Sequence, residues 1–415
     1  MATFQLIEIS LAHGDRPSYL GGSANHGTTS ARRNHLIESY RMIKRSQSLI
    51  LVSLLIIINV VCQPLPQNSN AGNSSRPLNM LVLGDSILWG QGLKPEHKSW
   101  YQVKTWLERT TGRKVLERIE AHSGTVIELA STDDRLSASN PEVNVALPTI
   151  HDQIDNALKS YTDASKVDLV LLSGCGNDVG VQNLLNASGT AEINNLTGEK
   201  CGAPMERLLR RITTSFPSAV VIVSGYYPFF SERSRNDFIL KGLTRRFLKT
   251  VPGAPKMKSK EILVRLTSNS KDWYDASNKT LADVAQKISA ELGGEHRRVM
   301  FARIDFPVEY SFAANQTRLW GFDRSPLRMM ALLVSFGRIL LPANDEVRGQ
   351  RSVSCKEVFK QESNETAEQR KERHNRRLLC RYASLGHPNK KGAELYAEAI
   401  IGLLPAALSL PNTPK

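Results

Sequence analysis

Continuous apolar runs, separated by helix-like patterns, are the main feature of the chain between residues 79 and 410. Apolar runs without polar alternation predict strands that are buried on both faces of a parallel sheet. Alternation of such runs with helices predicts an α/β domain with a central parallel sheet of about five strands. The runs that predict strands are Met80–Leu83, Val115–Ala121, Val167–Leu172, Ala219–Ser224 and Arg298–Ile304.

Helical patterns fill the intervals between these runs. Apolar positions at helical spacing predict helices at Trp100–Thr111, Met205–Thr213 and Asn389–Leu408. Helices that follow parallel strands cover both faces of the sheet, so the domain is expected to have three layers.

Two intervals are longer than an ordinary connection between a strand and a helix. Residues 231–295 include a predicted helix at Leu281–Leu292, and residues 323–380 include one at Leu327–Leu341. We interpret both intervals as insertions in a single domain that covers residues 79–410.

The first 78 residues lack the pattern of a folded domain. Residues 1–41 are polar and aperiodic, which indicates a disordered extension. Basic residues then precede an apolar run from Ser48 to Cys62, the layout of a secretory signal peptide and short for a membrane span. Since Met42 opens this segment, we expect translation to start there and residues 42–62 to be the signal. Residues 63–78, rich in Pro, Asn, Ser and Gly, predict a linker.

This layout predicts a secreted protein. The alternative is a signal anchor, in which residues 48–62 stay uncleaved and hold the protein at a membrane. Asn-x-Ser/Thr sequons fit a glycosylated secretory protein in a eukaryotic host. They occur at Asn73, Asn186, Asn195, Asn278, Asn315 and Asn364.

Cysteine usage also fits export to an oxidising compartment. The chain has five cysteines, and removal of Cys62 with the signal leaves an even number that permits three pairings. We expect the two pairings that are local in sequence. These are Cys175 with Cys201, and Cys355 with Cys380.

The charge of the chain changes this picture little. The 415 residues carry a net charge of +14, and the densest basic cluster is at 370–377. That cluster contains an acidic residue and no interleaved aromatics, so a solvated helix face or loop explains it better than a nucleic-acid site. No nucleic-acid partner is therefore expected.

Four short segments carry residue types that suit acyl transfer. Gly84-Asp85-Ser86 follows the first strand and offers a nucleophilic hydroxyl, and the segment around Gly124 offers a backbone N–H. Asn177, after the third strand, offers a side-chain amide, and His387, before the last helix, offers an imidazole. In a doubly wound sheet these positions converge on one edge, where such folds bind their ligands.

Each of these residues also has an interpretation without chemistry. Ser86 or Asp85 can cap a helix, Asn177 and Asp178 suit a turn after a strand, and His387 can simply enter a helix. The joint occurrence of the four segments, and no single position, favours an active site.

The four segments resemble, in order, the blocks of the SGNH hydrolases, also called the GDSL esterase/lipase family, over residues 79–408. The resemblance implies a flavodoxin-like three-layer α/β/α sandwich and ester hydrolysis through an acyl-serine intermediate. It implies that Ser86 is the nucleophile and His387 the general base. Ser86, Gly124 and Asn177 would form the oxyanion hole. The chain contains no Gly-x-Ser-x-Gly elbow of the standard α/β-hydrolases.

Two departures from the family pattern matter. Cys175 precedes Asn177 by two residues, and a bond to Cys201 would brace the loop that carries the asparagine. The position three residues before His387, usually aspartate in the family, is Ser384. The group that orients the imidazole would then be Ser384 itself, a backbone carbonyl or an acid from elsewhere, such as Asp305 or Glu309.

Several other residues near the expected edge have weaker claims. Asp85 and Asp178 are interpreted as supporting residues. His122 is either a second imidazole of the site or, as we expect, a packing residue. Aromatic residues near the strand ends line either an acyl or sugar pocket or the core; they are Trp89, Tyr226, Tyr227, Phe229 and Phe230.

The sequence thus predicts a secreted serine esterase that acts on a small-molecule ester, either a lipid or an acetylated carbohydrate. The alternatives are an inactive extracellular binding protein on the same fold, motivated by Ser384, and an O-acyltransferase that uses the same serine and histidine. No motif for a metal or an organic cofactor is evident, so none is expected.

Overall fold

A five-stranded, all-parallel sheet is the centre of the computed structural model. The structure describes residues 76–131, 135–187, 192–235, 258–293, 298–335 and 341–410. The strand order is β2-β1-β3-β4-β5. The strands are β1 Leu78–Leu83, β2 Val115–Ile119, β3 Val167–Leu172, β4 Val220–Ser224 and β5 Val299–Ala302. The predicted α/β class and the strand number are confirmed.

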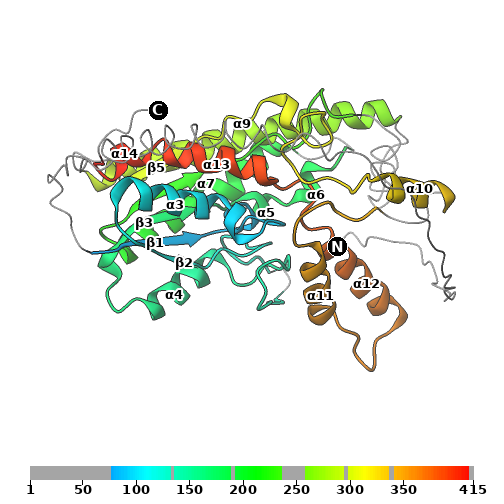
Figure 1. Ribbon diagram of the computed structural model, residues 1–415, viewed down its shortest axis with the longest axis horizontal. Helices are drawn as coiled ribbons and strands as arrows, with labels where there is room; N and C mark the ends of the chain where they lie inside the picture. Colours follow the sequence, from blue (N-terminus) through cyan, green and yellow to red (C-terminus); the bar gives the residue numbers. More distant parts are fainter. Residues whose placement is uncertain are drawn as a thin grey trace, which may run out of the picture. The chain divides into compact units, whose positions relative to one another are not determined.

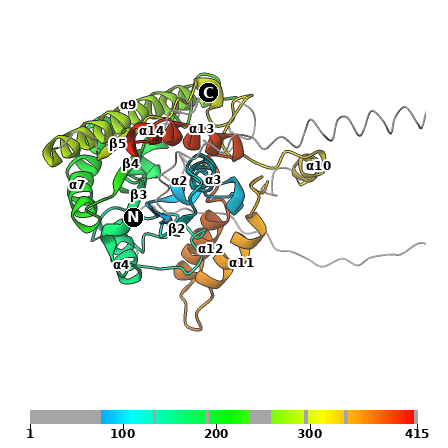
Figure 2. The ribbon, with the colours of Figure 1, turned by 60° about the vertical axis from the view of Figure 1, so that its left-hand side comes forward.

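Side chains of each inner strand alternate between two apolar layers, which is why these runs contain almost no polar residues. On one face, Leu81 and Leu83 pack in a core that includes residues of α4, α7 and α9. On the other, Met80 and Val82 pack with residues of α3, α13 and α14. Figure 2 shows the sheet between these two helical layers, so the domain has the expected three-layer arrangement.

The helices of these layers match the predicted ones in place, with different ends. α3 is Ser99–Thr111, whereas the helix predicted at Met205–Thr213 is the second half of α7, Ile193–Ser215. The predicted C-terminal helix divides into α13, Lys390–Ile401, and α14, Leu404–Ala407. The remaining helix of the sheet faces is α4, Ile150–Ser160.

The first predicted insertion adds to a sheet face. α9 runs from Ser259 to Leu292 as one long helix and packs along α7 (Figure 1). The sequence analysis predicts only its last third, although the buried residues Ile262, Leu266 and Trp273 also lie at helical spacing.

The second predicted insertion forms three helices. They are α10 Pro326–Val334, α11 Arg348–Val358 and α12 Ala367–Arg381. α11 and α12 lie side by side in both views (Figures 1 and 2) and are joined by the Cys355–Cys380 disulfide, whose Cα atoms are 5.9 Å apart. The basic cluster at 370–377 lies within α12 and is mostly exposed, as expected for a solvated helix face.

Short helices connect the main elements at the carboxyl edge of the sheet and elsewhere. The short α-helices are α2 Ser86–Trp89, α5 Gly176–Val179 and α6 Val181–Leu184. The single turns of 3₁₀ helix are η1 Pro95–His97, η2 Ala164–Lys166 and η3 Val308–Tyr310.

Residues 1–75 lie outside the described residues, so the extension, the signal segment and nearly all of the linker stay predictions. β1 begins at Leu78, within the predicted linker. Among the described residues, every helix is too short or too polar to cross a membrane.

Candidate active site

The carboxyl end of β1 presents Ser86 at the first position of α2. The Asp85 carboxylate accepts a hydrogen bond from the Ile87 N–H at 3.0 Å and so caps this helix. The same carboxylate accepts hydrogen bonds from the hydroxyls of Ser173 and Tyr226, both at 2.7 Å. Burial raises the pKa of Asp85. Asp85 is therefore a structural group that fixes the turn, as expected, and Ser86 is left free of a capping role.

The imidazole of His387 meets the Ser86 hydroxyl from the far end of the sequence. His387 Nε2 lies 2.7 Å from Ser86 Oγ. The segment that carries the histidine is held by backbone bonds, since the Trp320 N–H donates to the His387 carbonyl and the Gly386 N–H donates to the Trp320 carbonyl, both at 2.8 Å. The Tyr227 hydroxyl donates to the Gly386 carbonyl at 2.7 Å. The predicted pair of nucleophile and base thus exists in hydrogen-bonding geometry.

The electrostatic surroundings of His387 keep its imidazole neutral. Burial, reinforced by the positive charge of Arg351, lowers the pKa of His387 to about 4. Within the described residues, Nδ1 has no hydrogen-bond partner and is buried. With Nε2 bound to Ser86, a neutral ring is able to accept the hydroxyl proton.

None of the three side chains offered for orienting the imidazole bonds to its ring. Asp305 is exposed, and Glu309 pairs weakly with Arg233 at 3.7 Å. Ser384 is fully buried, but its hydroxyl donates to Asp345 at 2.7 Å and does not bond to the imidazole. No carboxylate in the described part of the chain bonds to His387 Nδ1, so the site is a Ser-His pair without the third member of a triad.

The two backbone N–H groups expected to bind an oxyanion belong to Ser86 and Gly124. Among the described residues, neither the Ser86 N–H nor the Gly124 N–H has a hydrogen-bond acceptor. Gly124 also has a packing role. A Cβ there would lie 2.3 Å from Asn144 Oδ1 and 2.6 Å from the Val145 backbone nitrogen, so glycine is required by close packing of the chain itself.

Asn177 joins the second and third predicted segments. Its Nδ2 donates to the Thr125 carbonyl at 2.8 Å, which occupies one of the two amide hydrogens. Buried Gln153 of α4 donates to the Gly84 carbonyl and to Thr125 Oγ1, at 3.0 and 3.2 Å, and accepts from the Gly84 N–H. Gln153 was not found from the sequence, where it is one polar residue on an amphipathic helix.

A disulfide braces the Asn177 loop, as predicted. Cys175 and Cys201 are bonded with Cα atoms 5.2 Å apart, which ties the loop to α7. Cys175 has a φ of 113°, a strained value for any residue with a Cβ. Burial, together with the charge of Asp85, raises the pKa of Asp178 to about 7, while its Oδ1 accepts from the Ile127 N–H at 2.9 Å. Asp178 thus supports the loop, as expected.

The remaining residues proposed for the site belong to its frame. His122 is buried, with its ring nitrogens 2.9 and 3.1 Å from the carbonyl oxygens of Ser123 and Ala138, which confirms the packing interpretation. The five aromatics also pack inside the domain. Trp89, Tyr226, Tyr227, Phe229 and Phe230 are buried or partly buried in contact with the apolar clusters.

One predicted glycosylation site is wrong. Asn278 lies in α9, is 6% exposed, and its amide bonds to the backbone of Tyr226 and Tyr274, so it is inaccessible in the folded chain. Asn195, Asn315 and Asn364 are exposed and Asn186 is half-buried, and their glycosylation stays a prediction. Asn73 lies outside the described residues.

Comparisons with known proteins give structural similarity only. No protein-family model and no curated protein matches the chain. An extracellular lipase from Streptomyces rimosus is 15% identical, covering 59% of this chain and 88% of its own, with a TM-score of 0.36. A phospholipase A1 from Streptomyces albidoflavus is 13% identical over 60% and 89%, with a TM-score of 0.37. A family two carbohydrate esterase from Clostridium thermocellum is 11% identical over 80% and 66%, with a TM-score of 0.37.

The four predicted segments meet at the carboxyl edge of the sheet. His387 bonds to Ser86, Asn177 bonds to Thr125, and the His122 N–H donates to the Gly84 carbonyl at 2.9 Å. The chain therefore resembles the SGNH hydrolases in the fold of its domain as well as in the order of its motifs.

Proposed function

We propose that the protein is a secreted serine esterase that hydrolyses carboxylic esters through an acyl-serine intermediate. The observation that carries this proposal is the 2.7 Å contact between His387 Nε2 and Ser86 Oγ. The contact lies at the edge where α/β sheets bind their ligands, and the absence of acceptors for the Ser86 and Gly124 N–H groups among the described residues supports their use as oxyanion donors.

The reaction follows from this geometry. Ser86 Oγ attacks the ester carbonyl while His387 Nε2 takes the hydroxyl proton, and the N–H groups of Ser86 and Gly124, with the free hydrogen of the Asn177 amide, stabilise the oxyanion. The imidazolium then gives its proton to the departing alcohol, which leaves the acyl group on Ser86. Water, deprotonated by His387, releases the carboxylic acid and restores the serine.

Burial of the base has a cost and a benefit for this reaction. Since no carboxylate faces Nδ1, the imidazolium formed during attack is stabilised less than in a complete triad. The lowered pKa of His387, about 4, in turn keeps the base unprotonated in mildly acidic solution. A working dyad with modest turnover and activity at low pH is the expected combination.

A fluorophosphonate probe tests the proposal directly. The serine oxygen displaces fluoride from phosphorus, and His387 accepts the proton, so only an activated serine is labelled. We expect the probe to label the wild type and not the Ser86→Ala variant. We also expect the labelled wild type to lose its hydrolysis of p-nitrophenyl esters. A chain-length series of these esters, with acetylated oligosaccharides beside it, separates lipid from carbohydrate substrates.

Absence of labelling in the folded wild type would instead indicate an inactive binding protein. Labelling with faster acyl transfer to added sugar hydroxyls than to water would indicate an acyltransferase. Ser277→Ala is a control for the serine variant, because Ser277 is also buried and its hydroxyl donates to the Trp273 carbonyl within α9, without touching Ser86, Asp85 or His387.

A further inference from the structure

The serine that replaces the expected aspartate before the base is anchored by an acid from the second insertion. Ser384 Oγ donates to Asp345 Oδ2 at 2.7 Å and accepts from Arg351 Nη2 at 3.0 Å. Ser384 and the side chain of Asp345 are fully buried. The Asp345 carboxylate therefore bonds to Ser384, and Ser384 lies between it and the segment that carries the imidazole. In a triad the carboxylate bonds to the imidazole itself.

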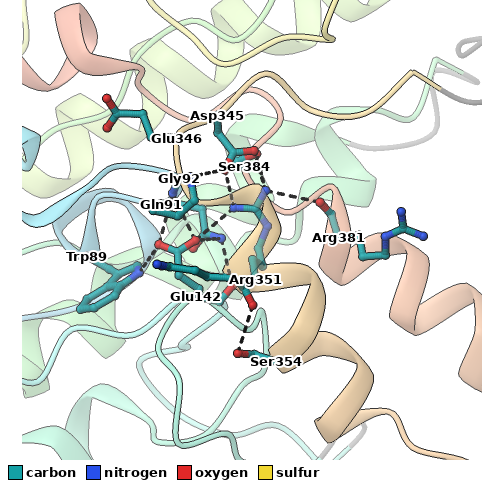
Figure 3. Close-up of polar contacts among 12 residues, drawn as sticks. Trp89, Gln91, Gly92, Glu142, Asp345, Glu346, Arg351, Ser354, Arg381 and Ser384 are labelled. Atoms are coloured by element: carbon teal, nitrogen blue, oxygen red, sulfur yellow. Dashed lines mark hydrogen bonds and ion pairs between the residues drawn. The ribbon is translucent and has the colours of Figure 1, made fainter. Parts of the chain in front are cut away.

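Arg351, on α11, is the centre of this buried group. Its side chain is fully buried and donates two hydrogen bonds to Asp345, at 2.6 and 2.9 Å, and one to Glu142 at 3.1 Å. Figure 3 shows the guanidinium between the two carboxylates, with Ser384 and the Arg381 carbonyl at its outer side. We call Arg351, Asp345, Glu142 and Ser384 the buried anchor.

The buried anchor also holds the chain just after the nucleophile. Glu142 accepts from Trp89 Nε1 at 2.8 Å and from the Gly92 N–H at 3.3 Å (Figure 3). A Cβ on Gly92 would lie 2.9 Å from the Asp345 Cβ and 3.0 Å from the Ser384 Cβ. The segment that follows Ser86 and the segment that precedes His387 are thus packed against the same charged group.

The link from the buried anchor to the base runs through the backbone. The Ser384 carbonyl accepts the His387 N–H at 2.9 Å and so closes a turn over residues 384–387. The Ser384 side chain fixes the first residue of this turn, and the Trp320 backbone fixes its end. Within the described part of the chain, Nδ1 makes no hydrogen bond of normal geometry, but the backbone of Ala383, Ser384 and Leu385 approaches the ring closely enough to favour its protonated form. The backbone of this turn and the Ser86 hydroxyl therefore orient the imidazole.

We propose that Asp345, Arg351 and Glu142, acting through the Ser384 hydroxyl, are the positioning residues that set His387 against Ser86. The proposal rests on the esterase function above. In this arrangement Asp345 and Arg351 of the second insertion fix the backbone turn that carries His387. In a triad, by contrast, the carboxylate bonds directly to the imidazole ring. None of the three charged residues touches the reacting atoms, so none is a catalytic residue.

Ser384→Ala is the narrowest test, because it removes one hydroxyl and leaves Arg351 paired with both carboxylates. Ser277→Ala is the matched control, since Ser277 is also fully buried and its hydroxyl donates to the Trp273 carbonyl, within α9. Ser384→Ala loses two hydrogen bonds to charged groups and Ser277→Ala loses one to a carbonyl, so the thermal midpoint is expected to fall further in Ser384→Ala, and kcat is compared at a temperature where both variants are folded. We expect kcat to fall roughly ten- to a hundredfold in Ser384→Ala alone, with KM within about twofold of wild type, because small displacements of a base cost that much.

A spectroscopic readout separates failure of this proposal from failure of the esterase function. The imidazole ¹⁵N signals of His387, assigned by their loss in His387→Gln, report its position whether or not the protein turns over esters. We expect these signals to move in Ser384→Ala and to stay in Ser277→Ala.

The outcomes divide cleanly. If the wild type hydrolyses esters, a kcat in Ser384→Ala within twofold of wild type, or an equal fall in Ser277→Ala, overturns the positioning role. If the wild type neither hydrolyses esters nor reacts with fluorophosphonate, the esterase function fails, and the His387 signals alone decide. Unchanged signals in Ser384→Ala then overturn the positioning role, and displaced signals support it.

Discussion

The two partners of the Ser-His pair are held in different ways. Ser86 directly continues a central strand, and its neighbours Asp85 and Ser173 come from adjacent parallel strands of the sheet. His387 precedes α13 in a turn that the second insertion anchors through Ser384. The nucleophile is therefore placed first by the sheet, although Glu142 of the buried anchor also holds the chain after it. In the arrangement proposed above, the base depends on the buried anchor. One site can thus combine a nucleophile placed by the common sheet of the fold with a base whose support is particular to this chain.

Removal of Arg351, which supports the His387 segment, is expected to have the largest effect, a loss of unfolding free energy. Arg351→Met leaves Asp345 and Glu142 buried without their cation, a change that typically costs about 3–5 kcal/mol of unfolding free energy. Urea unfolding measures this loss. Arg207→Met, which removes an exposed arginine paired with Glu128, is the control and is expected to cost far less. Equal losses in the two variants would contradict the buried anchor.

Removal of Asn177, near the nucleophile, is expected to lower kcat strongly and to change the stability of the fold little. Loss of one oxyanion donor typically raises the barrier by about 3–4 kcal/mol, so kcat of Asn177→Ala should fall roughly a hundred- to a thousandfold. Asn79→Ala is the control, because the Asn79 amide also donates to a backbone carbonyl, that of Lys166 at 2.9 Å, at the amino end of β1. Wild-type turnover in Asn177→Ala would exclude the amide from the oxyanion hole.

One disulfide braces the Asn177 loop and the other joins the helices of the second insertion, so their removal tests the two supports of the site separately. They close loops of nearly equal length, 26 residues for Cys175–Cys201 and 25 for Cys355–Cys380, so removal of either should cost about 3 kcal/mol. We expect Cys175→Ala/Cys201→Ala to disturb the Asn177 loop and lower fluorophosphonate labelling through the oxyanion hole. Cys355→Ala/Cys380→Ala should instead displace the His387 imidazole signals. The same spectroscopic change in both pairs would mean that the two sides are not independent.

The pH dependence gives the smallest effect. Burial and the charge of Arg351 lower the pKa of His387 to about 4, and the base works only when neutral, so kcat/KM should fall on acidification through about pH 4. From pH 7 to pH 5 we expect a loss of about a tenth, against about 25-fold for an unperturbed histidine. Asp178, with a pKa of about 7, titrates in the same range. The measurement is therefore repeated in Asp178→Asn, and an acid limb near pH 6.5 in that variant would contradict the prediction.

The sheet side of the site could be predicted from the sequence because its signals are local. A continuous apolar run predicts a buried parallel strand, and a polar residue at its end is placed at the ligand edge by topology alone. Ser86, Asn177 and the number of strands follow from this logic. The first parts of α7 and α9 were missed for different reasons. Gly198, Gly202 and Pro204 argue against a helix at the start of α7, whereas the start of α9 does carry apolar residues at helical spacing.

The base side could not be completed in the same way. Ser384 showed that the expected acid was missing, but nothing local distinguishes Arg351, in a polar stretch of α11, from a solvated arginine. Asp305 and Glu309, the acids named as examples, are exposed and partly covered, respectively. The pairing of Arg351 with Glu142 and Asp345 depends on contacts between distant segments, which single-chain patterns do not report.

The long span of the Ser86–His387 bond has a consequence for biosynthesis. The two residues are 301 positions apart, so at 5–20 residues per second the ribosome makes the nucleophile roughly 15–60 s before the base. During this interval the nascent chain holds a serine that nothing deprotonates. The buried anchor closes equally late, because Ser384 follows Arg351 and Glu142 in the chain. If the proposed chemistry is correct, a growing chain cannot attack esters in the compartment where it is made, and hydrolytic capacity arises only when the last helices dock.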